Sequence, residues 1–399
     1  MDLGRINAQL DDWLTPRLPE MLSVLEHMVN MDTSSHDGED VNKLGEWLTG
    51  RLQSLGFKTL KLPKPPVPAD EPWRANMGNV FSAYTDEPGT GIFLPGHMDT
   101  VFPGGTVSRW HFEVNGDRAT GPGVADMKGG LLINQFAVIA LKELGLLDFP
   151  VTLTFSCDEE LGSVTSSVAL TEYMKNGWAC ISSEPTREFD QVIERSKGSG
   201  HLRLRVEGKA AHSSMDYASG ASAIIELAEK TLKINKLIDL DREIIVNTGL
   251  ISGGTSAGTV APLAESGIHM SYAKMDDGFA LLETIRGIAK ETTVPGTTSY
   301  LSGGIRLPPL EKNEKNAKMQ ELVKMAGAAV GINVKPIYAK WASEAGLGSY
   351  RMKLPSVCGM GPWGGGFHSE DEFLVISSLI PRCKMLALSI LLAGQAFKK

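Results

Sequence analysis

Hydrophobic and polar positions follow two periods along the chain, one helical and one of β type. Apolar residues three or four apart run twice through 18–55 and predict two helices, with a break near 32–35. Short apolar runs at 58–62, 79–84, 91–96, 151–157 and 179–184 predict strands, and the uniformly apolar run 129–145 predicts a buried helix. Strands that alternate with helices are typical of a layered α/β domain whose central sheet is largely parallel.

From about residue 200 the pattern changes to strand, helix, strand, strand, helix, strand. The strands are predicted at 201–208, 242–254, 267–275 and 297–304, and the helices at 221–234 and 279–291. This order is that of a split βαβ sandwich of the ferredoxin-like type, an α+β fold. Helices predicted at 317–330 and 379–394 resume the first pattern. We therefore predict a larger domain, 1–198 and 309–399, into which a smaller domain, 199–308, is inserted.

Composition narrows the class of protein. The chain has 399 residues, 42% of them hydrophobic, and 47 acidic against 39 basic residues give it a formal net charge of −8. A nucleic-acid partner is not expected, because such binders usually concentrate positive charge. The four cysteines lie far apart with no CxxC pair, which argues against a disulfide framework. The chain starts without a basic segment and apolar core, and the late apolar run 386–393 is too short to span a bilayer. We therefore expect a cytoplasmic protein with no membrane partner.

Acidic and histidine side chains gather at the predicted strand ends. They are His97 and Asp99 after the strand 91–96, Glu159 and Glu160 after 151–157, Glu184 at the end of 179–184, Asp126 in a glycine-rich turn before the buried helix, and His368 in the run GGGFHSE. In an open α/β sheet ligands bind beyond the carboxyl ends of the strands, so these side chains are expected to converge on one crevice. That much negative charge needs a positive partner, and histidine with carboxylate is a normal ligand set for zinc. Two divalent ions about 3.5–4 Å apart would activate a shared water and polarise a carbonyl.

With these motifs the chain resembles the M20 metallopeptidases, the dizinc group that includes glutamate carboxypeptidases (carboxypeptidase G), aminoacylases and dipeptidases. The resemblance covers almost the whole chain and implies a three-layer catalytic domain of the dizinc exopeptidase type with an inserted lid and dimerisation domain. It implies that one zinc is bound by His97 and Glu184, the other by Glu160 and His368, and that Asp126 bridges them. Asp99 would hydrogen-bond the imidazole of His97 and fix its tautomer. Glu159 would be the general base toward the bridging water, and manganese or cobalt would be substitutes for zinc.

The family also carries a histidine in the lid, in a run like GKAAHSS, and His212 occupies that position. The resemblance implies that His212 helps to stabilise the oxyanion, often across a homodimer whose contact the lid provides. The substrate pocket departs from the family pattern at three places: Thr259, where close relatives have asparagine, Ser271, where glutamate-releasing relatives often have arginine, and the run KWASEA, which includes Trp341. We therefore predict an intact hydrolytic core with an altered pocket, in which Arg306 is a candidate clamp for an anionic group.

Each of these positions also has an ordinary interpretation. A lone histidine is more often a core residue than a ligand, an acidic pair after a strand is often solvated, and Asp126 is placed to cap the next helix. Glu184 stands before a proline, as turn residues do, Arg306 is equally suited to a surface ion pair, and Trp341 to packing. Together the motifs favour a hydrolase of an amide or peptide bond in a small substrate. Aminoacylase, dipeptidase, and N-acyl, carbamoyl or aryl-amide hydrolase activities stay open. Outside that class, the alternatives are a catalytically silent binding protein and a thiol hydrolase that uses Cys157.

Overall fold

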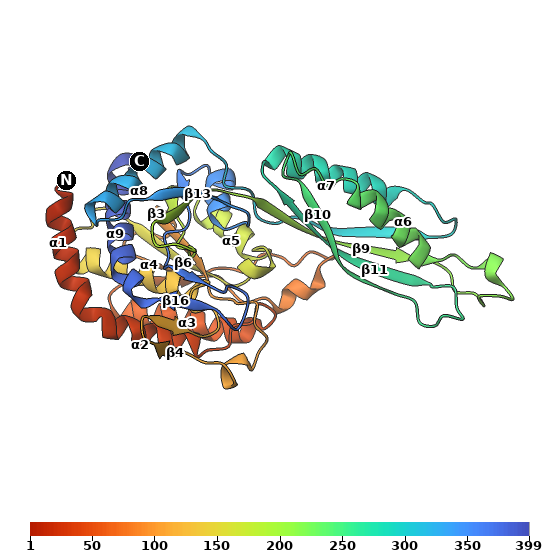
Figure 1. Cartoon of the computed structure of the whole chain (residues 1–399), viewed down its shortest axis with the longest axis horizontal. Coiled ribbons are helices and arrows are strands. Elements are labelled where there is room, and N and C mark those ends of the chain that lie inside the picture. The colour runs from red at the N-terminus through yellow and green to blue at the C-terminus, as the bar shows by residue number, and fades with distance from the viewer. Residues whose placement is uncertain (399) are drawn as a thin grey trace. The chain divides into compact units, whose positions relative to one another are not determined.

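The computed structural model describes residues 1–398 and divides into two compact units (Figure 1). The first contains Met1–Val67, Trp73–Ser196 and the chain from Leu310 onward. The second contains Lys197–Pro309 together with the short segment Pro68–Pro72. The sequence pattern had placed that short segment in the larger domain, because nothing in its composition marks it as part of the insertion.

The first unit is built on a six-stranded mixed sheet. Its order is β1 (Lys58–Lys61), β2 (Phe81–Tyr84), β6 (Val151–Ser156), β3 (Thr90–His97), β7 (Asn176–Ile181) and β14 (Ser356–Val357). The four strands from β6 to β14 run parallel, whereas β1 and β2 pair antiparallel at one edge. All of β6 and nearly all of β3 are buried, as expected of parallel strands covered on both faces.

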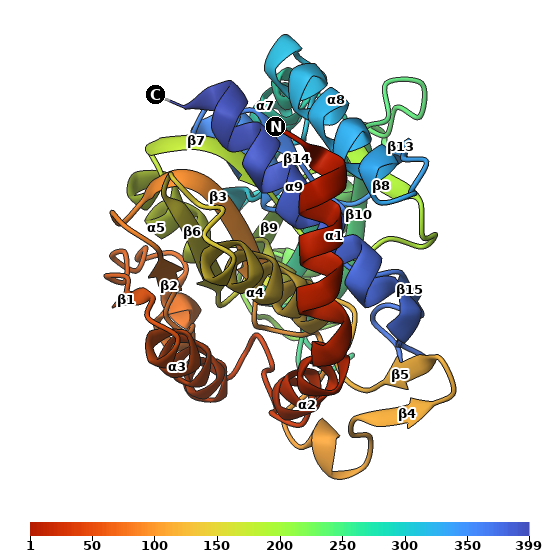
Figure 2. The same cartoon turned by 90° about the vertical axis from the view of Figure 1, so that its left-hand side faces the viewer.

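Within residues 1–398, seven α-helices of the first unit cover this sheet and one another. They are α1 (Leu3–Leu14), α2 (Leu18–Val29), α3 (Gly38–Ser54), α4 (Lys128–Glu143), α5 (Ser166–Tyr173), α8 (Glu314–Ala329) and α9 (Leu379–Phe397). Figure 2 shows α1, α4 and α9 in front of the sheet, where α9 packs against α1, α4 and α8. The sequence analysis did not predict α1, although Ile6, Leu10, Trp13 and Leu14 form its buried face.

The C-terminal helix starts where the sequence predicted it and extends three residues beyond the predicted end at 394, and a 3-10 turn precedes it. By length and composition alone, the segment Ile376–Phe397 is long and apolar enough to cross a membrane. The expectation that this part of the chain is too short to do so considered only the run 386–393 and was wrong about the length of the apolar segment. In the structure 78% of the most apolar 18-residue stretch of this segment is buried inside the protein. A helix that is apolar on every side and covered by other helices is typical of a domain core.

Two smaller sheets complete the first unit. One has four short antiparallel strands in the order β15 (Gly364–Gly365), β16 (Phe373–Val375), β5 (Arg118–Thr120) and β4 (Glu113–Asn115). The other pairs β8 (Gln191–Ser196) in parallel with β13 (Lys335–Ala339). The first of these sheets matters for the site, because β5 leads into the loop before α4 and the turn between β15 and β16 carries His368.

Helix α4 begins in close contact with the end of β7. A Cβ atom on Gly130 would lie 2.0 Å from the main-chain oxygen of Ser183, so only glycine fits there. The close approach brings the loop before α4, which contains Asp126, against the segment that follows β7 and contains Glu184.

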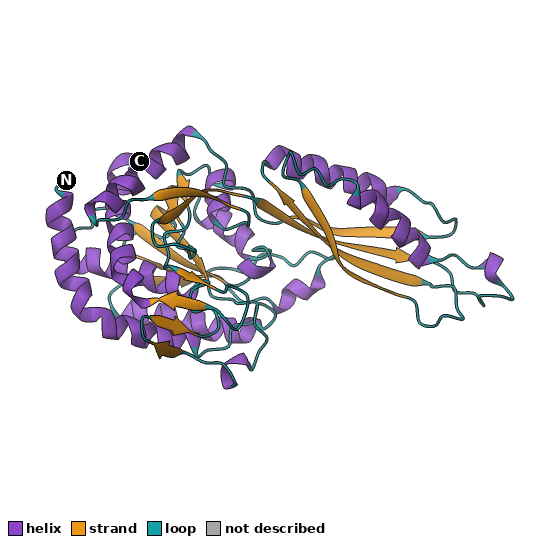
Figure 3. Ribbon diagram, viewed as in Figure 1, coloured by secondary structure: helices purple, strands orange, loops and turns teal. Residues whose placement is uncertain are grey.

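The second unit is a four-stranded antiparallel sheet with two helices, coloured orange and purple in Figure 3. Its elements are β9 (Gly198–Glu207), α6 (Ala223–Asn235), β10 (Ile245–Gly253), β11 (Leu263–Tyr272), α7 (Met275–Lys290) and β12 (Thr298–Ile305), and the strand order is β10-β11-β9-β12. Alternating residues such as Leu202, Leu204 and Val206 of β9 join the buried core with both helices. The split βαβ order predicted from the sequence is the observed one.

Candidate active site

The predicted ligands come from three neighbouring strands of the central sheet and from two loops of the small sheet. His97 is the last residue of β3, Glu159 and Glu160 begin a 3-10 turn after β6, and Glu184 lies just beyond β7. Because β6, β3 and β7 are parallel neighbours, their carboxyl ends meet at one edge of the sheet. The two loops add Asp126, before α4, and His368, between β15 and β16.

Asp126 stands between the two histidines. Its Oδ1 lies 3.4 Å from Nε2 of His97, and its Oδ2 lies 3.4 Å from Nε2 of His368. Each of these nitrogens also faces a second carboxylate. Nε2 of His97 is 3.8 Å from Oε2 of Glu184, and Nε2 of His368 is 3.2 Å from Oε2 of Glu160. The five side chains therefore form two pairs that share Asp126.

These separations suit a pair of divalent metal ions. Atoms bound about 2.1 Å from a tetrahedral zinc lie about 3.4 Å from one another, which follows from the tetrahedral angle. The four nitrogen–oxygen separations, 3.4, 3.4, 3.8 and 3.2 Å, scatter around that value. One ligand atom each of His97, Asp126 and Glu160 also lies within 4.8 Å of the other two. Imidazole with carboxylate is a donor set that zinc accepts, so these residues fit the metal that the sequence analysis predicted.

The carboxylates of the site favour positive charge on the two histidines, as the pKa values of these residues indicate. Hydrogen bonds to Asp126 and Glu160 raise the pKa of His368 to about 11. Burial lowers the pKa of His97, but hydrogen bonds to Asp126 and other carboxylates outweigh it and raise the pKa well above its usual value. Burial raises the pKa of Glu184, and it raises the pKa of Glu160 to about 7. The carboxylates thus require positive charge at the histidine nitrogens, and a divalent ion bound to neutral imidazole supplies it.

His368 itself has a left-handed backbone, with φ of 63°. Such a conformation is uncommon for residues other than glycine and is often found at functional sites. The preceding Gly366 has φ of 68°, and a Cβ there would lie 2.2 Å from the main-chain oxygen of Asp371. The glycine run in GGGFHSE therefore serves the tight turn that presents His368.

Asp99 holds the main chain of both glutamates after β6. Its buried carboxylate accepts hydrogen bonds from Oγ of Ser35 at 2.7 Å, from the N–H of Glu159 at 3.0 Å and from the N–H of Glu160 at 3.2 Å. Nδ1 of His97 lies 2.9 Å from the main-chain oxygen of Asp99 and 3.5 Å from its carboxylate. The main-chain oxygen is thus the nearer acceptor, and the predicted contact between Asp99 and the imidazole is present. A proton on Nδ1 leaves Nε2 as the nitrogen that faces a metal.

Two further carboxylates lie beside the five predicted ligands. Burial, with the charges of Glu184 and Glu160, raises the pKa of Glu159 well above its usual range. Burial also raises the pKa of Glu344 to about 7, and Oγ of Ser163 donates to its Oε1 at 3.1 Å. Glu159 was predicted from the sequence, whereas Glu344 was not, although it belongs to the run KWASEA that departs from the family pattern. Trp341 of the same run is 39% exposed.

Three of the remaining predicted residues, His212, Thr259 and Ser271, belong to the second unit. His212 forms an isolated antiparallel bridge with Thr259. The Nδ1 atom of His212 accepts hydrogen bonds from the N–H groups of Ser214 and Met215, each at 3.2 Å. Nδ1 is therefore an acceptor, and the ring proton is on Nε2. Ser271 lies on β11 and is 8% exposed. The parts of these residues in catalysis and substrate binding stay predictions.

Arg306 is engaged within the second unit. Its two terminal nitrogens donate to the two carboxylate oxygens of Glu71, and both side chains are buried. Glu71 belongs to Pro68–Pro72, so this ion pair fastens that segment to the second unit. From the sequence, Arg306 was a candidate for either a surface ion pair or a substrate clamp. The observed pair is buried rather than at the surface, and the clamp stays a prediction.

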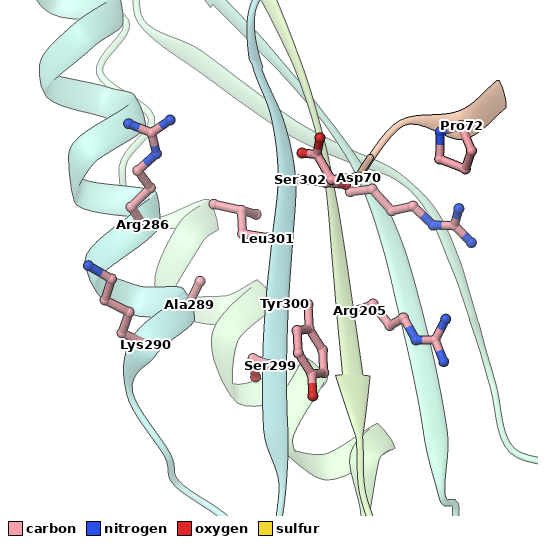
Figure 4. Close-up of a pocket in the computed structure, with 11 residues that line it drawn as sticks. Asp70, Pro72, Arg205, Arg286, Ala289, Lys290, Ser299, Tyr300, Leu301 and Ser302 are labelled. Atoms are coloured by element: carbon pink, nitrogen blue, oxygen red, sulfur yellow. The ribbon is translucent and has the colours of Figure 1, made fainter. Parts of the chain in front are cut away.

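A hollow of about 780 Å³ lies around β12 in the second unit (Figure 4). Its basic side chains are Arg286 and Lys290 of α7 and Arg203 and Arg205 of β9. Each of the three arginines already pairs with a carboxylate of the same unit. Exposed ion pairs of this kind contribute little to stability. None of the four residues predicted for the second unit lines this hollow.

The thiol alternative finds no support in the environment of Cys157. The side chain is buried, and burial raises the pKa of its thiol well above the usual value. A cysteine nucleophile needs access and a lowered pKa, so the structure argues against a thiol hydrolase. All four cysteines are buried and free.

Comparison with known proteins adds an independent line of evidence. The model of the family described as peptidase family M20/M25/M40 matches residues 93–391. Carboxypeptidase G2 of Pseudomonas sp. (strain RS-16) is 26% identical over 384 residues, which are 95% of this chain and 90% of that protein. Among solved structures, an M20 family metallo-carboxypeptidase from Sulfolobus solfataricus has a TM-score of 0.75 at 16% identity and covers 94% of this chain and 99% of its own. A Bacillus subtilis protein described as a dinuclear metal binding peptidase from the M20 family has a TM-score of 0.64 at 13% identity, with 96% and 99% covered.

Proposed function

Because the chain belongs to peptidase family M20/M25/M40 and is a hydrolase of peptide or amide bonds, we propose that it acts through two zinc ions at the edge of the central sheet. His97 and Glu184 would hold one ion, Glu160 and His368 the other, with Asp126 between them. The observation that carries this proposal is Asp126, whose two oxygens face Nε2 atoms of different histidines at 3.4 Å each. A carboxylate that only capped α4 would have no reason to be shared in this way.

The chemistry divides between the metal and the chain. Bound zinc would polarise the scissile carbonyl and lower the pKa of a water. Glu159 would take a proton from the attacking water and pass it to the departing nitrogen. Oδ1 of Asp99 accepts a hydrogen bond from the N–H of Glu159 at 3.0 Å, which fixes the main chain of this base. It also fixes Glu160, so the base and a ligand are positioned by one carboxylate.

His212 is the proposed donor to the oxyanion that forms when water adds to the carbonyl. The hydrogen bonds that Nδ1 accepts from Ser214 and Met215 leave the proton on Nε2. A neutral imidazole in that tautomer can donate one hydrogen bond, as an oxyanion requires. Replacement by asparagine keeps a donor of similar reach, whereas alanine removes it, so we expect His212→Asn to retain more activity than His212→Ala.

The substrate is proposed to be a small amide or peptide, cleaved by a carboxypeptidase-type reaction in a pocket that differs from the glutamate-releasing relatives. Ser271 offers a nearly buried hydroxyl where those relatives often have a cation. Arg306, the other candidate for binding a carboxylate, is occupied by Glu71. These two observations support the alternative that N-acyl or aryl amides without a free α-carboxylate are also cleaved.

The experiment is a hydrolysis panel on the zinc-loaded enzyme, with amine release as the readout. The panel pairs N-acylated amino acids with the corresponding simple amides and anilides. We expect Glu159→Gln to lower kcat about 10²- to 10⁴-fold while zinc content is unchanged. Unchanged turnover in that variant would remove Glu159 from the mechanism. Cleavage of the amino-acid conjugates alone would show that the carboxylate is needed after all.

We also propose that the protein is a homodimer formed through the second unit. Exposed apolar side chains lie on α6 and on β10, one of the two outer strands of its sheet: Ile225 and Leu232 on the helix, and Leu250 and Ile251 on the strand, each more than half exposed. Clustered apolar exposure on a soluble domain is typical of an interface. An outer strand also has unpaired main-chain groups that a second copy can use.

The dimer is tested by measuring the molar mass of the protein by light scattering as it elutes from a size-exclusion column. The double change Leu250→Ser and Ile251→Ser should give a monomer, because it removes apolar area from the centre of the proposed contact. Leu240→Ser is a matched control, since Leu240 is 73% exposed but lies outside α6 and β10. A wild type that elutes as a monomer at micromolar concentration would contradict the proposal.

A further inference from the structure

Glu372 accepts three main-chain hydrogen bonds from the loop that carries Asp126. Its Oε1 accepts from the N–H groups of Ala125 and Asp126 at 2.9 and 3.0 Å, and its Oε2 accepts from the N–H of Gly123 at 3.2 Å. The side chain is only 1% exposed. A buried carboxylate is costly unless donors surround it, and three convergent N–H groups offset part of that cost. Only an acceptor with two oxygens can satisfy all three donors.

The place of Glu372 in the fold joins two loops of the site. It follows His368 by four residues and directly precedes β16, whose Phe373 pairs with Thr120 of β5. The strand β5 leads into the loop of Asp126, and the turn between β15 and β16 carries His368. The carboxylate of Glu372 therefore ties the main chain of one loop to the other, beyond the last pair of the β5–β16 ladder.

We propose that Glu372 is a positioning residue of the metal centre, which fixes the main chain at Asp126 so that its two oxygens point to different histidines. The inference rests on the proposed function, because it concerns the same centre. Asp126 donates its own N–H to Glu372. A loss of that bond would let the residue turn about its main chain and move its carboxylate from the midpoint between His97 and His368.

The effect reaches both metal ions, because the carboxylate of Asp126 belongs to both proposed ligand pairs. Residues that orient metal ligands typically change metal affinity 10- to 100-fold when they are replaced. A residue that serves only stability would lower the unfolding temperature of the metal-free protein and leave the rate of metal release from the folded protein unchanged. The two roles are therefore separable by experiment.

The test measures zinc release from the purified, fully loaded protein into an excess of chelator. Glu372→Gln keeps the size of the side chain, but its amide nitrogen cannot accept a hydrogen bond. The N–H groups that face this nitrogen, either those of Ala125 and Asp126 or that of Gly123, are therefore left without an acceptor. We expect release at least tenfold faster than from wild type, a circular dichroism spectrum like that of wild type, and a shifted visible absorption of the cobalt-loaded form. Glu113→Gln is the matched control, because Glu113 lies on β4 of the same small sheet and is 70% exposed at the side chain.

Release from Glu372→Gln at the wild-type rate, with an unchanged cobalt spectrum, would overturn the proposal. So would a variant whose only change is a lower unfolding temperature of the metal-free protein. If the glutamine variant does not fold, Glu372→Asp gives the same measurement with a carboxylate that is one methylene too short to reach the loop. A wild-type protein that takes up no zinc would instead refute the proposed metal centre, so the two failures are distinguishable.

Discussion

Replacing Asp99 by asparagine removes one hydrogen-bond acceptor from the middle of the site without changing its size. In the wild type, Oδ2 accepts from Oγ of Ser35 and from the N–H of Glu160, and Oδ1 accepts from the N–H of Glu159. Asparagine has a single oxygen, which we expect to stay with the two donors at the Oδ2 position. Its NH₂ group then faces the N–H of Glu159, so a donor meets a donor.

The magnitude follows from that single contact. A hydrogen bond to a charged group contributes about 1.5–3 kcal/mol, and about 1.4 kcal/mol corresponds to a factor of ten. We therefore expect kcat/KM of Asp99→Asn to fall about 10- to 100-fold. The loss should lie mainly in kcat, because the displaced group is the proposed base, Glu159, rather than a residue of the substrate pocket.

The assay is steady-state hydrolysis of the best amide in the panel, with zinc content measured on the same samples. Ser35→Ala is the matched comparison, since it removes one donor to Oδ2 and leaves the bond to Glu159 in place. Its loss should be the smaller of the two. Asp99→Asn activity within twofold of wild type, at equal zinc content, would refute the role given to this carboxylate.

Three further predictions concern the ligands and the second unit. Asp126→Asn should reduce bound zinc to one ion per chain or none, as measured by elemental analysis, and two retained ions would contradict its shared position. Arg306→Met should destabilise the second unit by about 3–5 kcal/mol, because the buried carboxylate of Glu71 loses its ion pair with the guanidinium of Arg306, and an unchanged unfolding midpoint would contradict this. The free energy of unfolding should fall as the pH drops from 6.5 toward 4. Burial, with the charge of His269, lowers the pKa of His201 to about 4. In this pH range the unfolded chain therefore binds a proton at His201 that the folded chain does not. Urea unfolding at pH 7 and 5 measures this, and His201→Gln should show a weaker dependence.

The parts of the fold predicted best are those with strong hydrophobic patterns. The runs at 91–96 and 151–157 became β3 and β6, because strands buried on both faces need uninterrupted apolar sequence. The small sheet beside the site could not be predicted, since β15 consists of Gly364 and Gly365 alone and has no side-chain pattern. Its strands exist through pairing with distant segments rather than through local preference.

The site divides in a similar way. His97 and Glu184 were found because each lies at or just beyond the end of a recognisable strand, and parallel strands bring their ends together. Among the residues that hold such ligands, Asp99 was predicted, but Ser35 and Glu372 were missed, because their contacts join segments that are far apart in the sequence. Ser35 reaches Asp99 across 64 positions, and Glu372 reaches Asp126 across 246. No local spacing marks such pairs, so only the folded structure reveals them.

The most direct test of the central claim is diffraction from crystals of the zinc-loaded protein at the zinc absorption edge. We expect two anomalous peaks about 3.5–4 Å apart, one beside His97 and Glu184 and the other beside Glu160 and His368, with Asp126 in contact with both. A single peak, or no peak at Asp126 in a protein that hydrolyses amides, would contradict it.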